Sequence, residues 1–170
     1  MSSRIEHRAE FPRPLDEVLA ALAGEDSLRD RLEKIGGHDA ALLEYTKSEG
    51  EIAYTMRQGI PADKLPGVVR SLHSGDLMVQ REQNWRQASD RAASGSATAS
   101  VSGVPGAITA RSELTESGGK TTLVITGEAK VSIPLVGGKI ERSIAENVTR
   151  LLDHESEFIA KQLTDDGKDS

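Results

Sequence analysis

Apolar and polar residues alternate at the start of the chain, from residue 4 to residue 11. This period of two predicts a strand with one buried face, because successive side chains of a strand point to opposite sides. The strand is expected to end at Pro12 and Pro14, which lack a backbone hydrogen-bond donor. The residues expected on its buried face are Ile5, His7, Ala9 and Phe11.

Apolar residues then recur every three or four positions, which indicates two short helices. They cover residues 15–22 and 28–35, and Gly24 and Gly36 stand where each helix ends. Alternation returns in a predicted hairpin that turns at Glu49 and Gly50. With the first strand, the pattern predicts seven strands, of which the other six are 41–48, 51–58, 77–85, 97–102, 108–114 and 121–133.

Two segments between these strands have patterns of their own. The polar residues 88–95 are expected to form a turn. Residues 60–75 predict a short helix that begins near Pro66 and ends near Gly75, as a cap between two hairpins. Its apolar face is expected to carry Leu65, Val68, Val69 and Leu72.

The last strand meets Pro134, which ends its hydrogen-bond ladder. Gly137 and Gly138 are expected to let the backbone turn sharply beside the sheet. A single apolar stripe at helical spacing then predicts one long helix with a solvated face that includes Glu141 and Arg150. The stripe consists of Ile140, Ile144, Val148, Leu151 or Leu152, Phe158 or Ile159, and Leu163.

Length and charge limit the classes of function. A chain of 170 residues fits one domain, here residues 1–164 with a flexible tail at 165–170. The net charge of −6 argues against a nucleic-acid partner. The absence of cysteine excludes disulfides and thiolate metal sites and fits the cytoplasm, and no apolar run predicts a signal peptide or a transmembrane segment.

The polar candidates for chemistry are isolated in the sequence. His7 shares the buried face of the first strand, but no carboxylate or nucleophile can be assigned beside it. The other histidines show no metal-ligand spacing, so no metal and no cofactor are predicted. The segment "SGGKTT" lacks the first glycine of a phosphate-binding loop, and the serines of residues 93–102 form no nucleophile elbow. No catalytic residue is therefore predicted.

Several longer segments resemble a known superfamily. They are "LPGVVRSL", "QNW", "VSGVPGAITARSEL", "GEAKVSIPLVGGKIERSIAENV" and "HESEFIAKQL". With the order of elements, they make the chain similar to the START-like (SRPBCC) superfamily, and within it to an uncharacterised actinobacterial domain family of unknown function. The resemblance implies an α+β helix-grip fold, in which a curved antiparallel sheet of about seven strands wraps around the C-terminal helix.

The resemblance also implies an apolar cavity between the sheet and that helix. Ala97 and Ala99 support it, because methyl groups cannot fill a gap of about 10 Å between sheet and helix. The alternative is a solid core, in which Trp85 or Phe158 lies across these small residues. The residues expected at the cavity are His7, Tyr45, Tyr54, Met56, Val68, Leu72, Trp85, Ala97, Ala99, Ile108, Ile144, Val148 and Leu151.

Three classes of function remain open. The first is a monomeric, non-catalytic binder or carrier of a small hydrophobic ligand, lipid-like or polyketide-like, held by burial of apolar surface. The second is a module that binds a protein partner. The third is a cyclase- or dehydratase-like enzyme, in which His7, Tyr45 or Tyr54 polarises a carbonyl, although alternation provides no paired acid and base. The first class is preferred.

Overall fold

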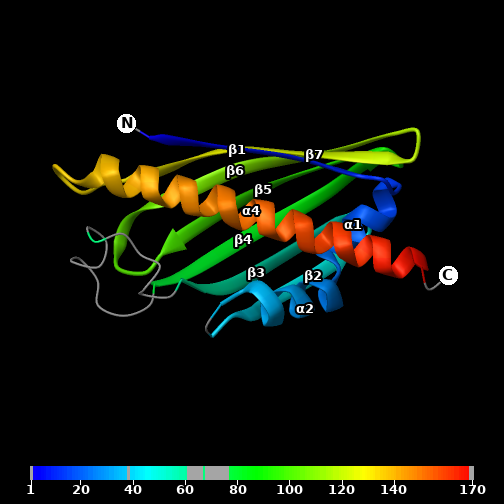
Figure 1. Ribbon diagram of the computed structural model, residues 1–170, viewed down its shortest axis with the longest axis horizontal. Helices are drawn as coiled ribbons and strands as arrows, with labels where there is room; N and C mark the ends of the chain where they lie inside the picture. Colours follow the sequence, from blue (N-terminus) through cyan, green and yellow to red (C-terminus); the bar gives the residue numbers. More distant parts are fainter. Residues whose placement is uncertain (1, 38, 61–66, 68–76, 169–170) are drawn as a thin grey trace.

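The computed structural model describes residues 2–37, 39–60, 67 and 77–168 (Figure 1). Seven strands precede a long C-terminal helix, and two short helices follow the first strand, as predicted. The predicted cap, with Val68 and Leu72, lies outside the described residues. The elements are β1 (Ser3–Phe11), α1 (Leu15–Ala23), α2 (Glu25–Ile35), β2 (Ala41–Ser48), β3 (Glu51–Ile60), β4 (Leu77–Ser89), β5 (Ala92–Val101), β6 (Val104–Ser117), β7 (Lys120–Val131) and α4 (Gly137–Lys168).

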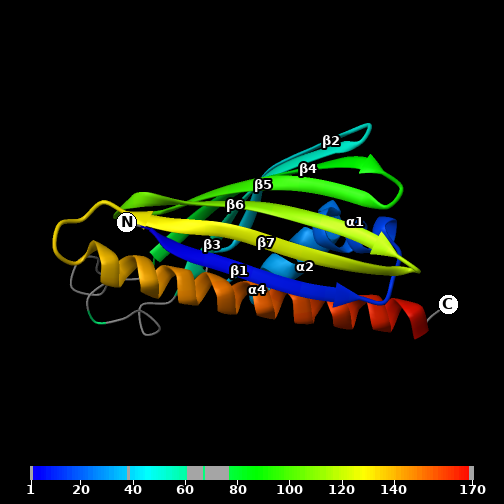
Figure 2. The same cartoon turned by 90° about the horizontal axis from the view of Figure 1, so that it is seen from above.

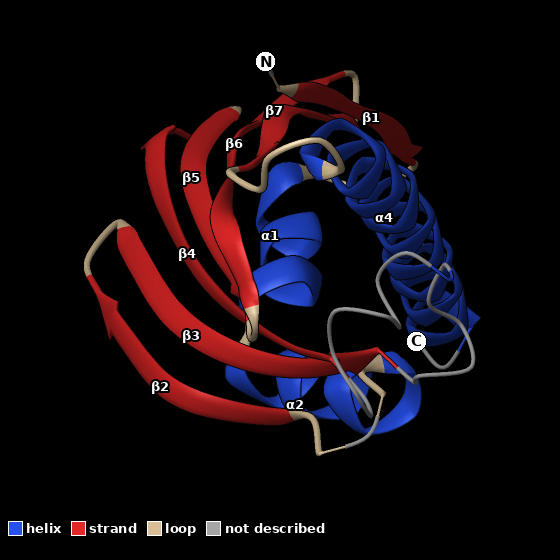
Figure 3. Cartoon of the chain, turned by 90° about the vertical axis from the view of Figure 1, so that its left-hand side faces the viewer, coloured by secondary structure: helices blue, strands red, loops and turns tan. Residues whose placement is uncertain are grey.

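The strands form one antiparallel sheet in the order β1-β7-β6-β5-β4-β3-β2. Each strand from β2 to β6 pairs with the next strand along the chain, and β1 pairs with β7 along its whole length. Figure 3 shows the sheet as an arc with α1 and α4 on its concave side. The curvature leaves β1 and the β2–β3 hairpin on opposite sides of the concavity.

Helix α4 does not cover the sheet evenly. It packs mainly on β1 and β7 and touches α1 and α2, so it follows one side of the arc (Figure 2). The main core gathers where these elements meet, and its fully buried side chains include Phe11, Leu15, Leu28 and Ile159. A second, smaller core joins Leu77, Val104, Val131 and Ile140 near the start of α4. Helix α4 therefore packs more closely on the β1 side of the sheet than on β4 and β5.

The turn between β4 and β5 is shorter than the polar sequence of residues 88–95 predicts. Only Asp90 and Arg91 form it, and β5 begins at Ala92. Ala93 is buried in the core, so the alternation of this strand continues through residues that resemble a loop. Alternation did not predict this part of the strand, because its small and polar residues differ little in hydrophobicity from one position to the next.

The connection from β7 to α4 also differs from the prediction. The left-handed residue is Leu135, with φ of 71°, and neither Gly137 nor Gly138 has a positive φ. A Cβ at Gly137 would lie 2.9 Å from the carbonyl oxygen of Val131, whereas one at Gly138 would meet only the end of the Arg142 side chain, at 4.0 Å. The close backbone approach therefore belongs to Gly137 alone.

Glu141 corrects the prediction of a uniformly solvated helix face. Its side chain is buried, and its Oε2 accepts a hydrogen bond from the backbone N–H of Val131 at 2.9 Å. That N–H stands at the end of β7, beyond the last residue pair of the β1–β7 ladder. The carboxylate therefore satisfies a backbone donor and joins the N-terminal part of α4 to the sheet.

Candidate ligand-binding site

An apolar wall lines the space between the sheet and α4. Ala97, Ala99 and Val101 of β5 alternate toward the helices, yet each is only half-buried. Ile144 and Val148 of α4 are half-buried as well, and Ile144 shares with Ala99 the lining of a space of about 10 Å³. Apolar side chains on the inner face of a central strand are ordinarily buried. Their exposure shows that other side chains cover this part of the inner face incompletely.

The α1 end of the same hollow is filled. Tyr54 and Trp85 are buried there, and the indole N–H of Trp85 donates to the Tyr54 hydroxyl at 3.3 Å. An enclosed space of about 20 Å³ remains beside them and Leu22, room for about one water molecule. Trp85 lies opposite Gly95 in the ladder, two residues before Ala97. The core is therefore solid at this end, whereas Ala97, Ala99 and Val101 along the rest of β5 are half-buried.

A cluster of charged side chains lines the space at the filled end. Glu155 projects from α4, and its two carboxylate oxygens each accept a hydrogen bond from Nη1 of Arg81 on β4 at 3.1 Å. Nε of Arg31 on α2 lies 3.6 Å from Oε2 of the same carboxylate, and its Nη1 donates to the carbonyl of Leu22 at 3.3 Å. Three elements that are distant in sequence are thus joined through one buried glutamate.

The electrostatics of this cluster keep its members charged. Burial alone would raise the pKa of Glu155, but the charges of Arg81 and Arg31 outweigh it and hold the pKa below its ordinary value of 4.5. Burial would likewise lower the pKa of Arg81, but Glu155 outweighs it and raises that pKa. At neutral pH the cluster therefore holds two positive charges and one negative charge.

His7 points into the molecule, as the alternation of the first strand predicts. Its Nε2 lies 2.7 Å from Oγ of Ser156, and its Nδ1 lies 3.1 Å from Oδ1 of Asp153. Both partners belong to α4, so the contact holds β1 to the helix. The structure corrects the expectation that no carboxylate or nucleophile accompanies His7. These partners lie almost 150 residues away in sequence, and no local pattern could have shown them.

The other predicted site residues divide into three groups. Tyr54, Met56, Trp85 and Ile108 are buried, whereas Ala97, Ala99, Ile144, Val148 and Leu151 are half-buried. Ala99, Ile108 and Ile144 line one space, and Tyr54 and Trp85 line the other. Tyr45 has a different position: its hydroxyl donates to the carbonyl of Ala23 at the end of α1 at 2.7 Å, and burial is the main cause of its raised pKa.

Sequence reasoning missed the polar residues of the hollow. Each of them occupies a position where the periodicity calls for an apolar side chain. Arg81 and Gln83 continue the inward alternation between Val79 and Trp85, and Glu155 falls four residues before Ile159 in the helical stripe. A charged residue at a core position was the available signal, because such residues are rarely buried without a partner. The missed residues are Arg31, Arg81, Gln83, Ser112, Glu155 and Ser156.

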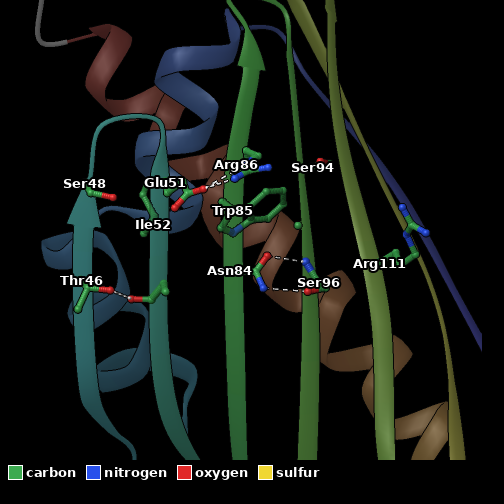
Figure 4. A pocket seen from close by; sticks show the side chains of 12 residues that line it. Thr46, Ser48, Glu51, Ile52, Asn84, Trp85, Arg86, Ser94, Ser96 and Arg111 are labelled. Carbon is green, nitrogen blue, oxygen red and sulfur yellow. Dashed lines mark hydrogen bonds and ion pairs between the residues drawn. The ribbon is translucent and has the colours of Figure 1, made fainter.

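A second depression lies on the other face of the sheet, across β2 to β6. Figure 4 shows it with the helices behind the strands. Its volume is about 660 Å³, and several of its polar groups bind one another. Arg86 pairs with Glu51 at 2.6 Å, and Asn84 bonds Ser96 through both ends of its amide. An exposed surface whose polar groups are paired offers a ligand little, so the hollow on the concave face is the better candidate.

Comparison with solved structures identifies the fold. The structure of a START superfamily protein from Mycobacterium smegmatis aligns with a TM-score of 0.60 at 10% identity and covers 94% of this chain and 98% of its own. Norcoclaurine synthase from Thalictrum flavum, solved with dopamine and hydroxybenzaldehyde, aligns with a TM-score of 0.52 at 11% identity over 95% of this chain and 88% of its own. The fold is therefore the START-like helix grip.

Comparison of sequences places the chain more narrowly. An uncharacterized protein of Mycobacterium tuberculosis is 31% identical over 166 residues, which cover 92% of this chain and 94% of the relative. Among the described residues, no helix combines the length and apolar content needed to cross a membrane. Residues 6–163 match a family profile, and the chain accordingly belongs to the family described as "Protein of unknown function (DUF2505)".

Proposed function

We propose that this protein binds a small hydrophobic molecule in the hollow between its sheet and α4, and that it does so without catalysis. The observation that carries the proposal is the half-buried apolar wall of Ala97, Ala99 and Val101 opposite Ile144 and Val148. Covering this surface with an apolar ligand would contribute about 25 cal/mol for each Å² removed from water. Norcoclaurine synthase, a structural neighbour, holds small organic molecules, which supports a similar use of the fold here.

One constellation favours an enzyme as the second candidate. Asp153, His7 and Ser156 lie in the order of a carboxylate, a base and a hydroxyl, with contacts of 3.1 and 2.7 Å. Two features oppose catalysis. Ser156 lies within α4, where its backbone N–H belongs to the helix, and Arg31 and Arg81 are directed at Glu155. Stabilisation of an oxyanion beside Ser156 would therefore compete with the helix and with Glu155 for these donors.

Binding of a neutral fluorescent probe tests the proposal. N-phenyl-1-naphthylamine should brighten on addition to the wild-type protein, since it fluoresces in apolar surroundings. In Ala99→Trp, the large side chain should fill the hollow and weaken binding at least about tenfold, a loss of 1.4 kcal/mol. Ser100→Trp is the matched control, because Ser100 is exposed on the opposite face of β5. Equal probe binding by the two variants, both with unchanged circular dichroism, would contradict binding in the hollow.

Two further measurements separate the alternatives. Native mass spectrometry of the purified protein should show a co-purifying small molecule, whereas a co-purifying protein would favour the interaction module. Hydrolysis of p-nitrophenyl butyrate by wild type, lost in Ser156→Ala, would overturn the non-catalytic part of the proposal. We expect no such hydrolysis.

A further inference from the structure

The buried cluster of Arg31, Arg81 and Glu155 holds more positive than negative charge. Among the described residues, Glu155 is the one carboxylate within 4.0 Å of either guanidinium. The side chains of Arg31 and Glu155 are only 5% and 6% exposed. Burying a charge without a counter-charge is costly, so structures usually pair such charges. The cluster is therefore short of one negative charge.

Arg81 is the member of the cluster that a ligand can reach. Its side chain is 16% exposed, compared with 6% for Glu155. Its hydrogen bonds to Glu155 use only Nη1, so within the described part of the chain its Nε and Nη2 donors remain for another acceptor. Arg81 also lies directly opposite Ala99 in the β4–β5 ladder. The backbone of Arg81 is thus adjacent to a residue of the apolar wall.

The surroundings of Arg81 change from one side to the other. Toward the start of β4, the next inward residue is Val79, which is opposite Val101 of the apolar wall. Toward the filled end come Gln83 and the buried Trp85. A molecule that lies along the apolar wall and extends toward the filled end therefore reaches Arg81, whose side chain lines the space at that end.

A buried amide supplies a second unsatisfied group on this face. Gln58 of β3 is 5% exposed, and its Oε1 accepts no hydrogen bond from any residue that the structure describes. Met56, two residues earlier on the same face, is opposite Arg81. Gln58 is therefore a diagonal neighbour of Arg81 across the strand pair. A buried polar atom without a partner indicates that a polar group is absent from its surroundings.

We propose that the ligand is an anionic amphiphile whose carboxylate pairs with Arg81, while its apolar chain lies along Ala99, Val101, Ile144 and Val148. This inference rests on the proposed function. A carboxylate matches the planar fork of an arginine and carries the single negative charge that the cluster lacks. A phosphate monoester, at about −1.5 to −2, would exceed the cluster's excess of one.

The test compares dodecanoate with dodecanol, which share one apolar chain and differ in the head group. Displacement of N-phenyl-1-naphthylamine below the critical micelle concentration gives both affinities. Wild type should bind dodecanoate about 10- to 100-fold more tightly, as charge-assisted hydrogen bonds predict. Arg81→Gln should lower the affinity for dodecanoate to about that for dodecanol and so abolish this preference. Arg86→Gln, on the exposed face of the same strand, is the matched control and should retain the preference.

The possible outcomes distinguish failure of the carboxylate site from failure of the proposed function. Equal affinities of wild type for the two ligands, or a preference that survives Arg81→Gln, would overturn the carboxylate site while leaving hydrophobic binding intact. Failure of both ligands to displace the probe, or of the probe to bind, would overturn the proposed function as well. If Arg81→Gln does not fold, Arg81→Lys keeps the charge without the fork, and the preference should then fall without vanishing.

Discussion

Strand β4 carries two arginine–glutamate pairs on its opposite faces. Arg81 meets Glu155 inside the molecule, and Arg86 meets Glu51 on the outer face at 2.6 Å. The outer pair has the shorter contact, yet both of its side chains are more than half exposed. Water and salt weaken such a pair, whereas the inner pair is shielded from both. Surroundings, more than distance, therefore decide what each pair contributes.

The largest expected effect comes from removing the inner carboxylate. Glu155→Ala leaves Arg31 and Arg81 buried without a counter-charge, so it should lower the free energy of unfolding by about 3–5 kcal/mol. Glu51→Ala, the matched change outside, should cost less than about 1 kcal/mol. Urea denaturation followed by circular dichroism measures both. Similar losses for the two variants would show that burial does not distinguish the pairs.

Acid should reduce the contribution of the inner pair to the free energy of unfolding. The folded-state pKa of Glu155 lies below the ordinary value of 4.5, because the charges of Arg81 and Arg31 outweigh burial. Its stabilising contribution is therefore complete above pH 4.5 and is lost as the pH falls through the folded-state pKa. The stability difference between wild type and Glu155→Gln should be constant near neutrality and shrink below pH 4.5. A difference that grows on acidification would contradict the depressed pKa.

The His7 contact should matter less than the charged cluster. His7→Ala removes the contacts to Ser156 and Asp153, and it leaves the Ser156 hydroxyl buried without its partner. We expect a loss of about 1–3 kcal/mol in the free energy of unfolding, the usual cost of an unsatisfied buried group. Ser156→Ala removes the hydroxyl instead and tests the same hydrogen bond from the other side. A loss larger than that of Glu155→Ala would reverse the order proposed here.

The secondary structure could be predicted from the sequence because the hydrophobic pattern of each element lies within its own segment. Alternation located all seven strands, and the stripe from Ile140 to Leu163 located α4. Where neighbouring residues differ little in hydrophobicity, as from Ala92 to Gly95, the same reasoning placed the start of β5 too far along the chain. The fold was thus predictable as far as apolar and polar residues differed along each segment.

The site was less predictable because its groups come from distant parts of the chain. The apolar wall around Ala99 follows from alternation, but Arg81 and Glu155 are 74 residues apart, and Arg31 joins them from a third element. Periodicity can show that a charged residue occupies a core position. It cannot show which partner makes that position tolerable, since the partner depends on how the sheet curves around α4.

The smallest expected effect concerns salt, and it sharpens the comparison between the two faces of β4. Raising the ionic strength from about 0.1 M to 1 M shortens the screening length from about 10 Å to 3 Å. Exposed charges feel this change, so the small cost of Glu51→Ala should approach zero at high salt. The cost of Glu155→Ala should stay nearly constant, because few ions reach a side chain that is 6% exposed. If salt reduces both costs in the same proportion, the inner cluster is open to solvent ions, and the shielding assigned to it is wrong.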